Sequence, residues 1–422
     1  MKIYLKIISI IFITLLSNKA IAITLDEAID LGLTNSKEYK IEKYYLRAAE
    51  NNKKAGMSEF LPEVSLSYQT GKKQNIRSDG AGTDDFLTER TNTLSVTQPV
   101  FNGMRGVSTL KQGSAEYLAQ KFKLEDFKRE LILRIATNYL ETLRLEKTLK
   151  LTKDNVEYYR RILSRTKSKG SLTSENEIID NKIGYYNAKR NLEEAENKLQ
   201  QARFEYENLI GAKPENLEDT KKEMLVLSLE DLLKDKSLNP ALMQKHYEVA
   251  ALKQAYKKEV GSLAPKVNIS ANYSKQENLV YLDGGNLESK SIMLDVTIPL
   301  FQKGSEYFGI KKAKYDLKIK KEEFQLTSLE VEKKINQTFK EYDYSKKSYD
   351  QISNIFSLAK RKLARNQKSY NLRALSLISL LKIRIERNES EIKFHEAKAN
   401  LYAVYYKLKL LTKDIGRADG NE

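Results

Sequence analysis

The chain has 422 residues, of which 41% are hydrophobic and 31% charged, with a formal net charge of +16 and no cysteine. This length allows about two or three globular units, and the mean hydropathy of −0.57 is too polar for a bundle of membrane-spanning helices. The absence of cysteine excludes disulfide scaffolds, cysteine zinc sites and thiol catalysis. No nucleotide-binding, hydrolase or HExxH motif is present, and His246 and His395 are far apart in the sequence. We therefore predict no enzyme activity, no catalytic residue, no cofactor and no metal site.

The first 22 residues differ from the rest of the chain. Lys2 and Lys6 are followed by an apolar run from Ile7 to Leu16 and by the small-x-small sequence Ala20-Ile21-Ala22. This pattern is typical of a secretory signal peptide and is too short to span a membrane as a stable helix. We expect residues 1–22 to be removed on export, and no lipid anchor, because no cysteine follows. Cleavage would remove three lysines and no acidic residue, and so lower the formal net charge from +16 to +13.

The basic residues do not form a nucleic-acid-binding patch. They are spread through glutamate-rich stretches such as Lys320-Lys321-Glu322-Glu323, and mixed charge of this kind is typical of a solvated helix surface. Lysine and glutamate at helical spacing also stabilise long exposed helices without any partner. We therefore expect no nucleic acid among the partners of this chain.

Two proline-free tracts predict long helices. All six prolines lie outside residues 100–213 and 300–422, and both tracts are rich in good helix formers. Apolar residues recur there at spacings of three and four, as in Leu133, Ala136 and Leu140, and such stripes bury against neighbouring helices. His395 lies on such a stripe, which favours a hydrogen-bonded histidine at a helix interface over a metal ligand.

Three ordered sequence matches at an offset of about 200 residues indicate an internal duplication. The matching pairs of segments are Leu25–Ile29 and Leu229–Leu233, Pro62–Ser67 and Pro265–Ser270, and Leu94–Phe101 and Leu294–Phe301. We predict two structural repeats, each with a helix, a β-hairpin and a pair of long helices. Their expected ranges are 23–213, with the hairpin near 60–101 and the helix pair at 103–210, and 214–422, with the hairpin near 264–301 and the helix pair at 304–412.

The hairpin segments alternate between apolar and polar residues, which predicts strands with two different faces. Val267 and Ile269 belong to the apolar row of one strand, and Leu294 and Val296 to that of its partner. In an exported chain this pattern indicates strands that cross a membrane with these four residues facing lipid. Four strands cannot close a barrel, and open edges are not tolerated in lipid, so we expect about two to four copies of the chain to complete the sheet.

With these features the sequence resembles the TolC-like outer membrane efflux proteins. The resemblance rests on the signal peptide, the opening segment Leu25–Asn35, the strand end Gln98–Gly103, its repeat Ile298–Phe301 and the duplication, and it covers essentially the whole mature chain. It implies a mixed α/β membrane protein that is mostly helical. Long antiparallel helical hairpins would form a trimeric α-barrel, and four strands per chain would contribute to a shared twelve-stranded transmembrane β-barrel.

The same resemblance implies a function and partners. The chain would be the outer-membrane channel of a tripartite efflux or type I secretion system, a passive exit duct with a long periplasmic extension and a gate at its periplasmic tip. Its partners would be two further copies of the chain, a periplasmic adaptor (membrane fusion) protein, an inner-membrane RND or ABC transporter, and outer-membrane lipid.

The functional end of these proteins is the periplasmic tip, where each pair of long helices turns. The resemblance places the adaptor-contacting turns at Gly170, Ser171, Leu172, Thr173 and Asn176 and at Ala374 and Leu375. It places the gate at Tyr370, Arg373, Ser379 and Lys382. Some family members carry carboxylates where this chain has Ser379 and Lys382, so we expect no acidic ring here and weaker cation selectivity.

Two other classes of protein share some of these features. An exported trimeric coiled-coil protein with a structural or adhesive role would explain the helices, but not the strand alternation or the duplication. A periplasmic adaptor has one long helical hairpin flanked by β-rich domains, whereas this sequence predicts two hairpins and no large β domain.

Overall fold

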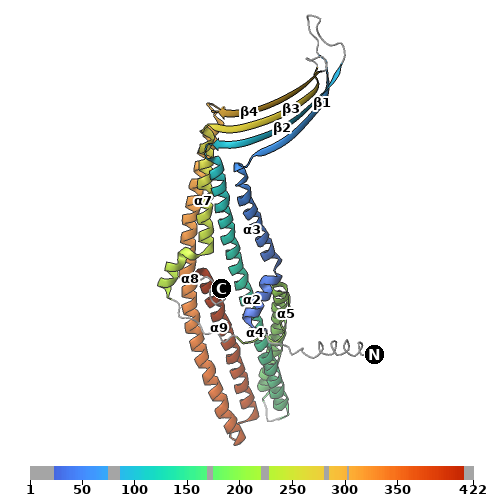
Figure 1. The fold of residues 1–422 in the computed structure, drawn as a ribbon. Helices are drawn as coiled ribbons and strands as arrows, with labels where there is room; N and C mark the ends of the chain where they lie inside the picture. The colour runs from blue at the N-terminus through green and yellow to red at the C-terminus, as the bar shows by residue number, and fades with distance from the viewer. Residues whose placement is uncertain are drawn as a thin grey trace, which may run out of the picture. The chain divides into compact units, whose positions relative to one another are not determined.

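The computed structural model describes residues 23–74, 86–168, 174–219, 228–279, 285–301 and 304–412. The predicted signal peptide, residues 1–22, lies outside the described residues. Within them no helix is both long enough and apolar enough to cross a membrane. The elements shown in Figure 1 are α2 (Leu25–Asn35), α3 (Lys37–Ala55), β1 (Glu63–Lys73), β2 (Leu87–Asn102), α4 (Arg105–Lys167), α5 (Glu175–Ile210), α6 (Leu229–Lys234), α7 (Pro240–Val260), β3 (Lys266–Leu279), β4 (Gly285–Thr297), α8 (Ser305–Asn371) and α9 (Leu377–Thr412).

The four strands form one antiparallel sheet in the order β1-β2-β3-β4. The pairing of β2 with β3 joins the two hairpins, and its register shifts between Pro99 and Phe101. Proline has no backbone N–H to donate, so it is tolerated within a sheet at such an irregularity. The sheet leaves β1 and β4 as its two edges. The expected fold class, mostly helical with four strands per chain, is confirmed.

The segment before the first hairpin contains two helices where the sequence predicts one. Thr24 and Glu27 form a capping box that begins α2. The helix ends at Ser36, which has ψ of 117°. The hydroxyl of Ser36 then accepts a hydrogen bond from the backbone N–H of Tyr39 at 3.1 Å. Serine competes with helical hydrogen bonding through its side chain, and this explains a break followed at once by a new helix.

The chain divides into two compact units. One comprises Met1–Ile41, Glu125–Asn239 and Glu330–Glu422, and the other comprises Glu42–Leu124 and Pro240–Leu329. The first unit has a hydrophobic core built from α2, α4, α5, α6, α8 and α9, in which Ile135, Tyr139, Tyr206 and Leu408 are fully buried.

The second unit contains the sheet and a layer of four helix segments. Contacts between successive helices give the order α3-α4-α7-α8. Gln120 of α4 donates to Glu42 of α3 at 3.0 Å, and the rings of Phe122 and Tyr247 stack at 5.5 Å between α4 and α7. Glu248 of α7 then binds Lys320 of α8 at 3.2 Å. The helices α3 and α8 are therefore the two ends of the layer, as β1 and β4 are the two edges of the sheet.

Two glycines make the closest backbone approach in this unit. Gly103 follows β2 with φ of 68°, in the left-handed region that favours glycine, and Gly261 lies just before β3. A Cβ atom on either residue would collide with the carbonyl oxygen of the other. Only hydrogen fits at both positions.

Tyr139 provides a test of how the first core is held together. Its hydroxyl donates to the carbonyl oxygens of Ile23 at 2.7 Å and Glu218 at 2.9 Å. We expect Tyr139→Phe to lower the free energy of unfolding by about 1–3 kcal/mol, because the carbonyls of Ile23 and Glu218 lose the hydrogen bonds from this hydroxyl. The matched control is Tyr206→Phe, because the buried Tyr206 hydroxyl has no hydrogen-bond partner among the described residues. Circular dichroism at 222 nm during heating should show a clear drop in the midpoint for the first variant and none for the second.

Candidate functional site

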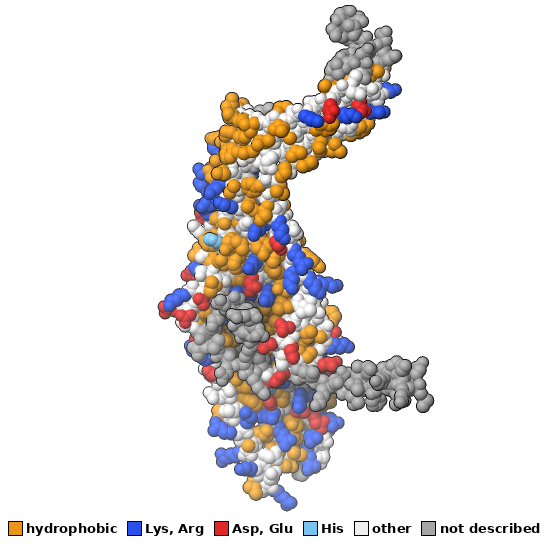
Figure 2. Space-filling model, viewed as in Figure 1, with side chains coloured by type: hydrophobic (Ala, Val, Ile, Leu, Met, Phe, Trp, Pro, Cys, Tyr) orange, Lys and Arg blue, Asp and Glu red, His pale blue; other side chains and the backbone are white. Residues whose placement is uncertain are grey.

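Alternate residues of the four strands form one continuous apolar face. One row across the sheet runs through Val64, Val96, Ala271 and Ile292, which are cross-strand partners. The adjoining rows pair Ile269 with Leu294 and Val267 with Val296, so the four residues predicted to face lipid lie together on this face. Ile269, Leu294 and Val296 are 42%, 65% and 56% exposed. Figure 2 shows hydrophobic side chains gathered over the sheet, and an exposed apolar surface of this kind marks an interaction site.

The apolar face extends over most of the length of a membrane-crossing band. From Val267 to Tyr273 it extends for six residues along β3, or about 20 Å at 3.4 Å per residue. Beyond Tyr273 the same face continues with Lys275 and Glu277. Aromatic residues lie at both ends of the band, Phe101 beside Val267 and Tyr273 at the other end, where its hydroxyl donates to Glu288 at 2.6 Å. Transmembrane strands carry such a band, about 25 Å tall and flanked by aromatic residues.

The opposite face of the sheet is polar and internally hydrogen-bonded. The hydroxyl of Ser270 donates to the carboxylate of Asp295 at 2.7 Å. The hydroxyls of Thr93 and Ser274 are 3.3 Å apart across β2 and β3. The two faces therefore differ in chemistry along most of the strand length, which fixes the register, since a shift by one residue would exchange them.

The turn between α8 and α9 contains the residues predicted to form the gate. Arg373 has φ of 58°, and its N–H donates to the carbonyl of Tyr370 at 2.9 Å, which ends α8. Ser376 begins α9, because its hydroxyl accepts from the N–H of Ser379 at 3.1 Å and lies 2.9 Å from the Ser379 hydroxyl. Arg373 and Lys382 are exposed, and Tyr370 and Ser379 are half-buried. The Ser379 side chain therefore takes part in the helix cap as well as in any pore lining.

The other predicted turn lies mostly outside the described residues. Gly170, Ser171, Leu172 and Thr173 fall in this gap. Asn176 is exposed in the first turn of α5, whose cap is Ser174. Of the corresponding residues in the second turn, Ala374 is exposed and Leu375 is half-buried.

Close to these turns, α4 and α9 are joined by contacts that could not be predicted from the sequence. The amide of Asn388 donates to the side-chain oxygen of Asn155 at 2.8 Å, and both side chains are buried. The guanidinium carbon of Arg384 lies 5.8 Å from the centre of the Tyr158 ring. Beneath them Ile162 packs with residues of α9, namely Ile378, Leu381 and Ile385. An asparagine on the apolar stripe of α9 was the one available signal, because buried asparagines at such positions usually pair across an interface.

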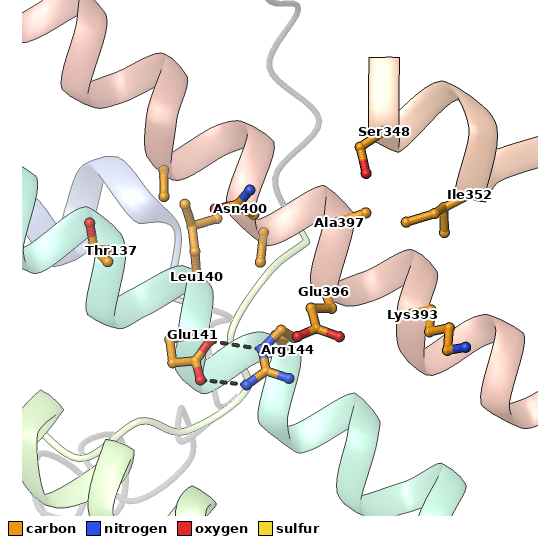
Figure 3. Close-up of a pocket in the computed structure, with 12 residues that line it drawn as sticks. Thr137, Leu140, Glu141, Arg144, Ser348, Ile352, Lys393, Glu396, Ala397 and Asn400 are labelled. Atoms are coloured by element: carbon orange, nitrogen blue, oxygen red, sulfur yellow. Dashed lines mark hydrogen bonds and ion pairs between the residues drawn. The ribbon is translucent and has the colours of Figure 1, made fainter. Parts of the chain in front are cut away.

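A groove of about 690 Å³ lies between α4, α8 and α9 in the first unit. Figure 3 shows Arg144 between the carboxylates of Glu141 and Glu396, with Nε of Arg144 2.8 Å from Glu141. The hydrogen bond to Glu141 raises the pKa of Arg144. Small side chains leave the groove open on the α9 side, among them Ala397. Its charges compensate one another, and among the described residues no group of three or more acidic, histidine or cysteine side chains could hold a metal ion.

Asp219 ties the segment after α5 to two long helices. Its carboxylate accepts from Lys147 of α4 at 2.7 Å and from Lys398 of α9 at 2.9 Å. Burial raises the pKa of Asp219, but the hydrogen bonds from the two lysines outweigh it and hold the pKa below the usual range. His395 lies beside this cluster, with Nε2 3.8 Å from Glu391. Burial, and then the charge of Lys147, lower the pKa of His395 to about 4.

The lowered pKa of His395 predicts a loss of stability in mild acid. Between pH 6.5 and about 4 the unfolded chain binds a proton at His395 that the folded chain does not. The free energy of unfolding should therefore decrease as the pH is lowered through this range. In His395→Gln this contribution is absent, and the thermal midpoint should fall less over the same window. Above pH 7 the slopes of the two proteins should agree. Parallel curves from pH 7.5 to 4.5 would contradict the assignment.

Comparisons with known proteins agree with this geometry. Residues 29–212 match the model of the outer membrane efflux protein family. The chain is 22% identical over 369 residues to the alkaline protease secretion protein AprF of Pseudomonas aeruginosa, a match that covers 81% of this chain and 73% of AprF. It is 20% identical over 305 residues to the outer membrane efflux protein BepC of Brucella suis, covering 71% of this chain and 65% of BepC.

Solved structures show the same fold. The outer membrane protein VceC of Vibrio cholerae superposes with a TM-score of 0.76 at 13% identity, over 92% of this chain and 96% of VceC. The structure of CusC gives a TM-score of 0.76 at 11% identity, over 92% and 91% of the two chains. Residues 29–212 therefore resemble the outer membrane efflux protein family, and the chain shares the fold of these solved structures.

Proposed function

We propose that this chain is the outer-membrane exit duct of a tripartite efflux or type I secretion system. The observation that carries the proposal is the four-stranded sheet, which has one continuous apolar face and one polar face. The names of the relatives agree with it, since AprF is a secretion protein and BepC an efflux protein. The duct is passive, and energy comes from a partner in the inner membrane.

The open edges of a single copy support a closed homotrimer. Each copy leaves the outer edges of β1 and β4 unpaired within the described sheet, and unpaired strand edges are costly in hydrocarbon. The end helix α8 also carries an exposed apolar stripe at spacings typical of a helix interface, Phe308, Tyr315, Ile319 and Leu326. At the other end of the layer, Tyr44 and Tyr45 of α3 are exposed. We infer that β4 and α8 of one copy meet β1 and α3 of the next, and that three copies close a twelve-stranded barrel.

We further propose that residues 1–22 are a cleaved signal peptide and that residues 23–213 and 214–422 are two repeats of one unit. The order of elements supports the repeats, because a short helix, a longer helix, a hairpin and two long helices occur twice. The mature chain then lies in the outer membrane, and its long helices extend into the periplasm. There it binds an adaptor protein that connects it to an RND or ABC transporter.

The gate in this proposal lies at the helix turns. Arg373 and Lys382, with Ser379 and Tyr370, surround the pore axis in three copies, and the turns at Gly170–Asn176 and Ala374–Leu375 contact the adaptor. The exposure of Arg373 and Lys382 supports this placement. The contacts of Asn155 with Asn388 and of Tyr158 with Arg384 hold α9 against α4 when the gate is closed.

Arginine substitutions on the two faces of β3 test the membrane placement. Ile269→Arg should lower the stability of the barrel by about 2–4 kcal/mol, because it places a charge in the hydrocarbon. Ser270→Arg is the matched control on the opposite face, where the carboxylate of Asp295 is available, and should cost much less. Urea-dependent folding into phosphatidylcholine vesicles measures both. Equal losses would mean that the assigned register is wrong by one residue.

A planar bilayer tests both the channel and the gate. The purified protein should form ion-conducting pores, and Lys382→Asp should shift the reversal potential in a salt gradient toward cation preference, because charges in a constriction act on permeating ions at close range. Lys234→Asp in α6 makes the same charge change at a side chain that is 66% exposed, and should leave the potential unchanged. Without pores the function is wrong, whereas pores that are indifferent to Lys382→Asp would remove Lys382 from the gate.

A further inference from the structure

Four lysines of α8 form a single stripe in the sheet-bearing unit. Lys311, Lys314, Lys318 and Lys321 recur at spacings of three, four and three, which places them on one face of the helix. All four residues are exposed. None of them forms a salt bridge within the part of the chain that the structure describes. The stripe is therefore a row of positive charge without a bound carboxylate.

Two acidic residues, Glu248 of α7 and Glu323 of α8, are engaged at the contact between α7 and α8. Glu248 and Glu323 both bind Lys320, at 3.2 and 2.7 Å, and both also bind Lys245 of α7. Lys320 marks the side of α8 that faces α7. At about 100° per residue, Lys311 and Lys318 lie roughly 180° and 160° around the helix from it. The carboxylates of α7 are thus on the wrong side of α8 to neutralise the stripe.

Exposed apolar and aromatic residues lie directly above the stripe, at the base of the sheet. Leu300 and Phe301 are 92% and 78% exposed, and Tyr307 in the first turn of α8 is 56% exposed. The ammonium of Lys311 lies 4.4 Å from the centre of the Tyr307 ring. Figure 2 shows basic side chains over the upper part of α7 and α8, next to this hydrophobic surface. An apolar band followed by tyrosine and then lysine is the arrangement of a membrane–water interface.

We propose that the upper end of this stripe binds the headgroups of anionic phospholipids in the membrane leaflet next to the base of the sheet. The inference rests on the proposed membrane placement of the strands. Along α8, Lys311 and Lys314 lie about 9 and 14 Å from Ser305, and Lys318 and Lys321 about 20 and 24 Å. The headgroup region of one leaflet is about 5–7 Å thick, and electrostatic attraction decays over about 8 Å at physiological salt. The upper two lysines therefore hold the lipid, and the lower two contribute little.

Two double variants of one helix separate this proposal from general electrostatics. Lys311→Gln with Lys314→Gln removes the upper pair, and Lys318→Gln with Lys321→Gln makes the same charge change on the same face lower down. The purified mature protein in nonionic detergent is titrated with phosphatidylglycerol. Phosphatidylethanolamine of the same acyl chains is the neutral reference, and bound lipid is counted by native mass spectrometry. We expect the upper variant to bind phosphatidylglycerol about tenfold more weakly and the lower variant less than about threefold more weakly. Binding of phosphatidylethanolamine should be equal in all three proteins.

Other outcomes overturn the proposal in distinguishable ways. Equal losses in both variants would point to a longer polyanion along the whole stripe, such as an acidic protein segment, and no loss in either would show that the stripe is only solvated. Flotation with neutral phosphatidylcholine vesicles checks the underlying placement separately. If the wild-type protein does not float, the membrane location fails and the lipid site fails with it. If all three proteins float alike and only the preference for phosphatidylglycerol changes, the weaker binding of phosphatidylglycerol is caused by the lysine substitutions.

Discussion

Backbone hydrogen bonding is the main constraint on this structure, because every amide and carbonyl that enters hydrocarbon must form a hydrogen bond within protein. A single copy meets this condition for β2 and β3, which pair on both sides, but not for the edges of the sheet. The same incompleteness recurs in the helices, where the end helix α8 exposes an apolar stripe. In the proposed trimer one event, the association of copies side by side, would both close the sheet and bury the helix stripe.

The strand faces could be predicted from the sequence because they depend on alternation alone. Val267 and Ile269 must share a face, and the register of β3 with β4 brings Val296 and Leu294 beside them. The helix stripes follow from periodicity in the same way. The strand faces and helix stripes are local features, because they depend on residues that are close together in the chain.

The features that could not be predicted depend on residues far apart in the chain or on an unfavourable local choice. Asn155 and Asn388 are 233 residues apart, and neither local sequence indicates that the two side chains are partners. The two lysines that converge on Asp219 belong to different long helices, so the bridge exists only after packing. Arg373 has a left-handed backbone conformation where glycine would be favoured, so the turn carries no glycine signal and its position was predicted only through the family resemblance. The break at Ser36 was missed because a serine inside a helical pattern is often tolerated.

The close approach of Gly103 and Gly261 has a consequence for how the sequence can change over time. Each glycine excludes a side chain at the other through its own carbonyl oxygen, which is backbone and present in every residue. A second substitution therefore cannot rescue the first, unlike in a side-chain contact, where a large residue can be matched by a smaller partner. The two positions are under the same constraint but do not compensate for each other. Among sequence variants of this protein they should appear as two independently fixed glycines and not as a co-varying pair.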